Sequence, residues 1–270
     1  MIAGVASEWD FAPAVLAPAG VVVALFAGAV LRMRARGRRD LAGWDRVALF
    51  ALAVVAALAA LVSPLDHLAD DSLLSAHMLQ HVLIGDLAPA LFLVAVRGPL
   101  AFFLLPASVL GPVARSAVTR AVLSNVLRPR VAFALWATNL AVWHVPTLYD
   151  AALAHQALHD FEHVCWLLAG ILVWTLLVDP AAHRRLTVGG RLALAVGMFA
   201  CGQILTDVLV LSFTSFYRAY HGAYGLSAVG DQQAAGIVMM VEQLLTLGTL
   251  AFVLLRPRFR RDRVELAAQT

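Results

Sequence analysis

Seven stretches of mostly apolar residues divide this sequence, and each approaches the roughly 20 residues that a helix needs to cross a membrane. Hydrophobic residues make up 61% of the chain and charged residues 14%, and the mean hydropathy is +0.82, far above that of a water-soluble domain. No stretch alternates like a barrel strand, and a helix satisfies its own backbone hydrogen bonds inside a membrane. The sequence therefore predicts an all-α fold, a bundle of seven transmembrane helices forming one integral-membrane domain over 1–270. The predicted helices cover 12–31, 47–63, 75–96, 131–148, 161–178, 192–213 and 234–255.

Arginine predicts the orientation of this bundle. All 20 basic residues are arginine, and 19 of them fall in alternate connections and in the C-terminal tail, leaving only Arg218 on the other side. Such a bias marks the cytoplasmic side, so we expect the N-terminus outside and the C-terminus inside. The net charge of +3 follows from these segments, so the basic character indicates membrane lipid as a partner and no nucleic acid.

One further apolar segment invites an eighth helix. Residues 99–113 are short, contain three prolines and lie between Arg97 and Arg115, so a crossing there would break the arginine asymmetry. We predict instead that residues 99–127 form an interfacial amphipathic segment on the cytoplasmic face.

Eight of the nine histidines fall near the predicted outer ends of the helices. His77 and His81 begin the third helix, and His159 and His163 begin the fifth if that helix starts slightly before its apolar core. Residues spaced i,i+4 lie on one face of a helix, so each pair can direct two imidazoles into the bundle. Such pairs are typical of sites that hold a metal ion or a haem, and a nearby thioether favours Cu(I). The candidate ligands are His77, Met78, His81, His144, His159 and His163.

Three acidic residues lie within predicted helices. A charged residue at the centre of a membrane helix costs roughly 2.5–3.5 kcal/mol, so we expect Asp86, Asp207 and Glu242 to face the bundle interior and to support function. At about 100° per residue, Asp86 projects about 140° from His81 and about 180° from His77, which predicts that it serves another surface of the helix. Two cysteines without a CxxC or CxxCH motif exclude covalent c-type haem.

The order His159, Glu162, His163 also gives an H-x-x-E-H pattern, in which two histidines bind zinc and the glutamate acts as a base. A membrane metallohydrolase is therefore one alternative. A haem-binding or electron-transfer membrane protein, with the histidine pairs as axial ligands, is another.

The run SPLDHLADDSLLSAHMLQHVLIGDLAPALFL at 63–93 resembles the signature of the CtaG family of cytochrome c oxidase assembly factors, the seven-span group tied to caa-type haem–copper oxidases. WHVPTLYDAAL (143–153), HDFEHVCWLLAGILVW (159–174) and DQQAAGIVMM (231–240) agree, so the resemblance extends over about 60–250. The chain departs from the family pattern at Asp86, where an apolar residue is expected, and at Met240, where an aromatic residue is more usual.

The resemblance implies a non-enzymatic role in maturing a haem–copper oxidase in a bacterial plasma membrane. It implies transient binding of copper and its delivery to cytochrome c oxidase subunits. The residues it marks are His77, Met78 and His81 on the third helix, His159, Glu162 and His163 on the fifth, His144 at the end of the fourth, and Asp231 and Gln232 before the last.

Overall fold

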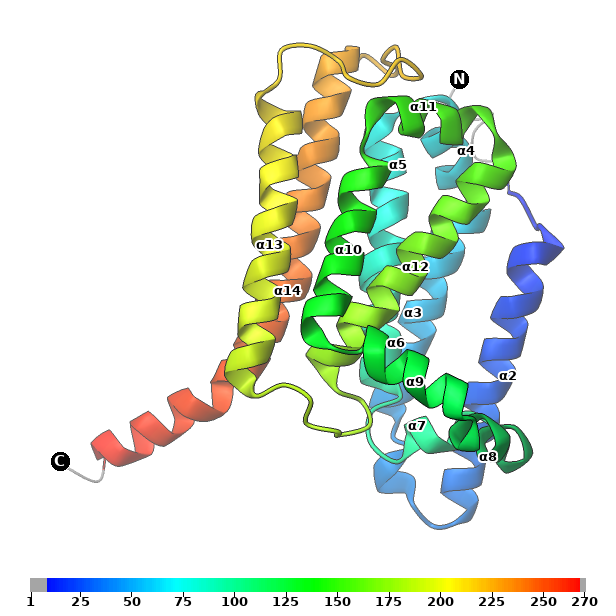
Figure 1. Cartoon of the computed structure of the whole chain (residues 1–270), viewed down its shortest axis with the longest axis vertical. Coiled ribbons are helices and arrows are strands. Elements are labelled where there is room, and N and C mark those ends of the chain that lie inside the picture. The colour runs from blue at the N-terminus through cyan, green and yellow to red at the C-terminus, as the bar shows by residue number, and fades with distance from the viewer. Residues whose placement is uncertain (1–8, 268–270) are drawn as a thin grey trace.

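The computed structural model describes residues 9–267, and every regular element within them is helical (Figure 1). Six helical segments are long and apolar enough to cross a membrane, which agrees with the predicted all-α, multi-pass architecture. Residues 1–8 and 268–270 of the predicted domain lie outside the described residues. The long helices are α2 (Pro13–Ala35), α3 (Trp44–Val62), α12 (Gln156–Val178), α13 (Val188–Leu211) and α14 (Ala228–Ala267), and the third span consists of α5 (Leu74–Val82), η2 (Leu83–Leu87) and α6 (Ala88–Ala95).

The fourth predicted helix is broken. Helix α10 (Pro129–Trp143) ends before α11 (Pro146–Ala154), and the two meet at 75°. Pro146 has no N–H for the preceding turn and disfavours helical geometry at the residue before it, so the predicted extent of 131–148 is wrong at its C-terminal end. The 15 residues of α10 rise about 22 Å, less than the roughly 30 Å of a hydrocarbon core. Within residues 9–267, the number of candidate spans reaches seven only if the bent pair counts as one.

The third span contains a π-helical turn, η2, just before Pro89. Pro89 cannot donate a backbone hydrogen bond to the carbonyl of Gly85, and that carbonyl instead faces Gly170 of α12. A β-carbon on Gly170 would lie 1.9 Å from the Gly85 oxygen, so glycine is required for this close approach. The contact fixes the third span against α12, and these two elements carry the paired histidines.

The two ends of the bundle differ in composition. Helix α4 (Pro64–Asp71), α11 and the α13–α14 connection gather at one end, which also holds the N-terminal turns of α5 and α12 (Figure 1). Helices α7 (Leu100–Phe103), α8 (Ala107–Arg115) and α9 (Ala117–Val126) lie at the other end, where the arginine-rich connections also lie (Figure 1). Residues 99–127 thus form short helices in place of an eighth span, while their location at a membrane interface stays a prediction.

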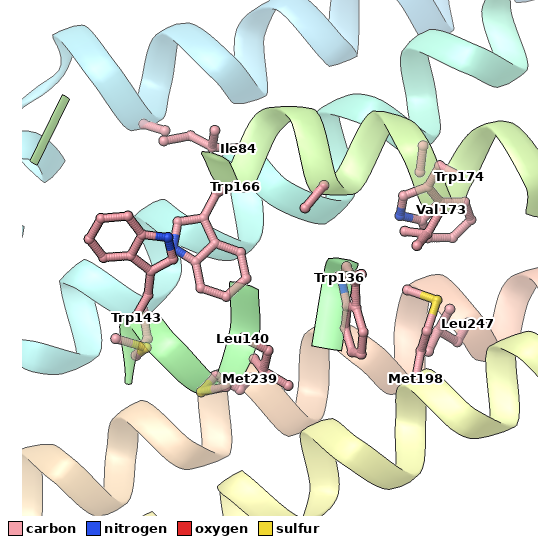
Figure 2. Packing of buried hydrophobic residues seen from close by; sticks show 14 of the residues in the cluster. Ile84, Trp136, Leu140, Trp143, Trp166, Val173, Trp174, Met198, Met239 and Leu247 are labelled. Carbon is pink, nitrogen blue, oxygen red and sulfur yellow. The ribbon is translucent and has the colours of Figure 1, made fainter. Parts of the chain in front are cut away.

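Large apolar side chains fill the space between α10, α12, α13 and α14. Trp166 and Trp174 lie two turns apart on α12, and Trp136 of α10 and Met198 of α13 belong to the same buried core (Figure 2). These residues are 1–6% exposed, so they form a close-packed part of the core next to the histidine-rich end.

Candidate metal centre

Three histidines and one glutamate converge at the histidine-rich end of the bundle. One nitrogen or oxygen from each of His77, His81, His159 and Glu162 lies within 4.8 Å of the others. The four side chains are only 0–3% exposed, and the sequence marked the three histidines as candidate ligands and Glu162 as a supporting residue. We call these four residues the buried cluster. It joins two helices, because His77 and His81 come from α5 whereas His159 and Glu162 come from α12.

Helix α12 begins earlier than its apolar core, as the histidine pairing requires. It starts at Gln156, so His159 and His163 lie one turn apart on the same helix, with ring centroids 4.2 Å apart. On α5 the rings of His77 and His81 are also 4.2 Å apart, and the two Nε2 atoms are separated by 2.9 Å.

Tyr220 defines the tautomer of His77. The Tyr220 hydroxyl donates to the carbonyl of Ala69 and lies 3.0 Å from Nδ1 of His77. Because the hydroxyl proton is used on Ala69, the hydroxyl oxygen accepts from Nδ1–H of His77. The lone pair of His77 is then on Nε2, which faces His81, and this is the arrangement of a metal-binding imidazole held by an outer partner.

The two cluster residues of α12 are held by an acid and an indole. His159 Nδ1 lies 3.7 Å from a carboxylate oxygen of Asp70 on α4, while its Nε2 is buried without a hydrogen-bond partner. Glu162 accepts from the indole N–H of Trp166 at 3.4 Å and lies 3.6 Å from Nε2 of His81. Both contacts orient their side chains toward the same small volume.

His144 and His163 lie next to the cluster but not in it. His163 has its ring 5.4 Å from that of His81, and its buried Nε2 has no partner. His144 donates from Nδ1 to the carbonyl of Leu140 at 2.8 Å, which leaves Nε2 as a buried lone pair, and its ring packs 5.9 Å from Trp166. Met78 is 1% exposed and packs in the hydrophobic core, so its predicted role as a sulfur ligand stays a prediction.

Asp231 and Gln232 hold the elements around the site. The fully buried Asp231 carboxylate accepts from the backbone N–H groups of Leu74 and Ser75, at 2.7 and 3.1 Å, and thereby caps the first turn of α5. Gln232 binds the backbone of the connection that leads to Tyr220, accepting from the N–H of Phe216 at 2.8 Å.

The three intramembrane acids have different environments. Both carboxylate oxygens of Glu242 are buried, as predicted. Asp207 is exposed on α13 and accepts from Gln203 one turn away, so the prediction that it faces the interior is wrong. Asp86 accepts from the indole of Trp174 at 2.9 Å and therefore faces α12, the helix that also carries His159. The expected rotation to another surface assumed a regular α-helix, whereas the π-helical turn at Asp86 advances each residue by less than 100°.

The donor set fits a small metal ion better than a haem. Two donors that each lie about 2 Å from one ion can be at most about 4 Å apart. The donor atoms of the cluster lie within 4.8 Å of one another, so the most distant pair would have to approach by less than about 1 Å to bind the same ion. The buried Nε2 of His159 has no hydrogen-bond partner, and such an ion would satisfy it. The imidazoles touch one another directly, and a porphyrin plane would have to separate His77 from His81.

Two acids near the site were not among the residues singled out in the sequence. Asp66 accepts from Gln80 on α5 at 2.5 Å, and Asp70 lies one turn further along α4, against His159. Burial and then the charge of a neighbouring acid, Asp70 for Asp66 and Asp71 for Asp70, together raise the pKa of each carboxyl from 3.8 to about 6. Their i,i+4 spacing behind Ser63 and Pro64, a typical helix start, could have indicated an acidic helix face.

Comparison with known proteins identifies a family. The sequence model of a family described as cytochrome c oxidase caa3 assembly factor matches residues 24–261, which include the buried cluster and every helix around it. No curated protein and no solved structure matches the chain.

Proposed function

The chain belongs to the family of cytochrome c oxidase caa3 assembly factors, and from this membership we propose that it binds copper at the buried cluster and delivers it to the oxidase. The observation that carries this proposal is the convergence of His77, His81, His159 and Glu162 within 4.8 Å. Imidazole and carboxylate together are a donor set that copper accepts, and hard cations such as Mg²⁺ prefer oxygen alone.

The charge of the cluster favours a monovalent cargo. Three neutral imidazoles and one ionised Glu162 carry a single negative charge, which one Cu(I) ion cancels. Cu(II) or Zn(II) would leave a net positive charge inside the bundle unless Asp70, beside His159, supplied a second carboxylate. Cancellation matters here because the cluster side chains are 3% exposed or less.

The arginine distribution suggests from which side copper arrives. If the arginine-rich end is cytoplasmic, as in bacterial plasma membrane proteins, the buried cluster lies near the outer surface. Copper from outside the cell would then enter at this end and pass sideways to an oxidase subunit in the same membrane.

The burial of the cluster supports a protein that binds and transfers a metal ion without catalysing a reaction. A metallohydrolase must keep a ligand position open to water and substrate. Glu162, which would be the base in the H-x-x-E-H pattern, is 1% exposed and lies among the other donors. We therefore propose that the protein is a metal carrier and not an enzyme.

The test is metal analysis of detergent-purified protein after incubation with Cu(I). We expect a single copper ion per chain in the wild type and none in His77→Ala/His81→Ala. His67→Ala/His221→Ala is the matched control, because both histidines lie at the same end of the bundle but are exposed. The same two variants are then expressed in cells that assemble the oxidase, and the copper content of the purified oxidase is measured.

Delivery predicts that the oxidase lacks copper only in the His77→Ala/His81→Ala strain. Equal copper binding by both double variants would reject the buried cluster as the site. Normal oxidase copper in that strain, despite loss of binding to the purified variant, would reject delivery as the function.

A further inference from the structure

Helix α4 covers the buried cluster at the histidine-rich end. The carbonyl of Ala69 accepts from Tyr220 and lies 3.4 Å from Nδ1 of His77. In the next position, a carboxylate oxygen of Asp70 lies 3.7 Å from Nδ1 of His159. One short helix therefore touches a cluster histidine on α5 and another on α12.

Carboxylates form a path of decreasing exposure across this helix. The side chain of Asp71 is 78% exposed and that of Asp70 is 29% exposed, whereas His159 is 3% exposed. Asp160, next to His159 on α12, is exposed, and the charges of Asp71 and Asp160 both act on Asp70. The Asp70 oxygen that lies 3.7 Å from His159 is buried and has no hydrogen-bond partner, so a cation bound there would displace no hydrogen bond.

Few positive groups oppose these carboxylates. His67 on α4 lies 4.0 Å from Asp71, and it is half-exposed. Arg218 is the arginine in the connection at this end, and its backbone N–H binds Asp150 on α11. The remaining arginines in the described connections lie at the opposite end of the bundle (Figure 1).

We infer that the acidic face of α4 is the entrance for the metal cation, and that Asp70 passes the cation from the surface to His159. This inference rests on the proposed copper binding and adds the route by which the cation reaches the buried cluster. Negative charge around a narrow site raises the local concentration of a cation and its association rate. A carboxylate is a weak ligand for a soft ion such as Cu(I), and imidazole is a stronger one, so transfer from Asp70 to His159 is downhill.

A different role for Asp70 would be to orient His159 as an outer partner of a metal-binding imidazole. The two roles affect different quantities. An orienting residue changes the affinity and the dissociation rate, whereas an entrance changes the association rate and its dependence on salt.

Stopped-flow fluorescence separates these roles. Purified protein in detergent is mixed anaerobically with Cu(I), and binding is followed by tryptophan fluorescence, with Trp166, 5.3 Å from the His81 ring, as a local reporter. Asp70→Asn is expected to slow association about tenfold, within the range of electrostatic steering, and Asp71→Asn/Asp160→Asn is expected to flatten the salt dependence. Metal analysis at equilibrium should show the wild-type copper content in each variant.

Two variants control for folding and charge. Asp70→Glu retains the carboxylate and should restore rapid loading. Asp207→Asn removes an exposed acid on α13, and it should load like the wild type with the same salt dependence.

Each outcome decides the inference. Wild-type association rates and salt dependence in Asp70→Asn and Asp71→Asn/Asp160→Asn would overturn the entrance while leaving copper binding intact. Faster dissociation with an unchanged association rate would assign Asp70 to orientation and overturn the entrance as well. A wild-type protein that binds no copper would overturn the proposed function, and the entrance with it.

Discussion

The carbonyl oxygen of Gly85 faces Gly170 so closely that a β-carbon on Gly170 would lie 1.9 Å from it. Gly85 lies four residues beyond His81 on the third span, and Gly170 lies two turns beyond Glu162 on α12. This backbone contact therefore sets the distance between the two halves of the buried cluster.

Gly170→Ala should separate the third span from α12. The added methyl group meets backbone and the ring of Pro89, neither of which can rotate away, and overpacking of this kind costs about 1–3 kcal/mol of folding stability. We expect a lower melting temperature in detergent together with weaker copper binding. Gly248→Ala is the control, because no atom lies within 4 Å of the added β-carbon. Equal melting temperatures for the two variants would contradict this account.

The sequence marked the three histidines of the buried cluster because they obey local rules. Two i,i+4 pairs near the ends of apolar helices place imidazoles on one helix face, and the side of the bundle follows from the arginine pattern. Contacts between distant segments follow no such rule. Tyr220 and His77 are 143 positions apart, and their hydrogen bond depends on how the α13–α14 connection folds back over α4.

Hydropathy gives the depth of a residue in the membrane but not the direction of its side chain. Asp207 and Glu242 looked equivalent in the sequence, yet Asp207 is exposed and satisfied by Gln203, whereas the Glu242 oxygens are buried. The pattern of apolar residues could not predict the break after Trp143 or the π-helical turn at Asp86, because neither changes the hydropathy of the helix. Only the prolines, Pro146 and Pro89, indicated an irregular backbone at these two places.

His144→Ala should retain the copper stoichiometry, whereas His159→Ala should lose it. The ring of His144 lies 5.9 Å from the Trp166 indole, edge to face, and it is absent from the group of donors that lie within 4.8 Å of one another. His144 is therefore not among the four donors that one ion can reach. Metal analysis of both variants after incubation with Cu(I) checks this difference. Loss of copper from His144→Ala, with its fold intact, would place His144 inside the site.

Tyr220→Phe should weaken copper binding without abolishing it. The substitution removes the acceptor that holds Nδ1–H of His77, and loss of such an outer partner typically costs about 10–100-fold in metal affinity. Competition with a chelator of known copper affinity measures the change. Tyr224→Phe, an exposed tyrosine in the same connection, should bind copper as the wild type does. An unchanged affinity in Tyr220→Phe would show that the Ala69 carbonyl, 3.4 Å from Nδ1 of His77, is a sufficient outer partner.

Substitution of Asp231 should disorder the start of α5. Its carboxylate accepts from two backbone N–H groups and from the Ser75 hydroxyl, the last at 2.6 Å. Leaving buried donors unpaired costs about 1–3 kcal/mol each, so Asp231→Ala should destabilise more than Asp231→Asn, which keeps one acceptor oxygen. Ser75→Ala removes only one of the three bonds and should have the smallest effect. Thermal unfolding of the three variants gives the order, and equal melting temperatures would contradict the capping role.

Asp66 should make stability depend on pH. Burial, followed by the charge of Asp70, raises the pKa of Asp66 from 3.8 to about 6. The folded state therefore holds this proton more tightly than the unfolded state, and the resulting stabilisation is complete below 3.8 and is lost as pH rises through about 6. Asp66→Asn cannot lose a proton, so its melting temperature should rise relative to the wild type between about pH 4 and pH 7. Asp207→Asn is the control, because it removes an exposed acid. A pH-dependent difference in melting temperature that appears in Asp66→Asn but not in Asp207→Asn is due to the burial of Asp66. If the difference in melting temperature between the wild type and Asp66→Asn stays constant over this range, Asp66 is ionised throughout. The hydrogen bond from Gln80 would then lower the pKa of Asp66 by more than burial raises it.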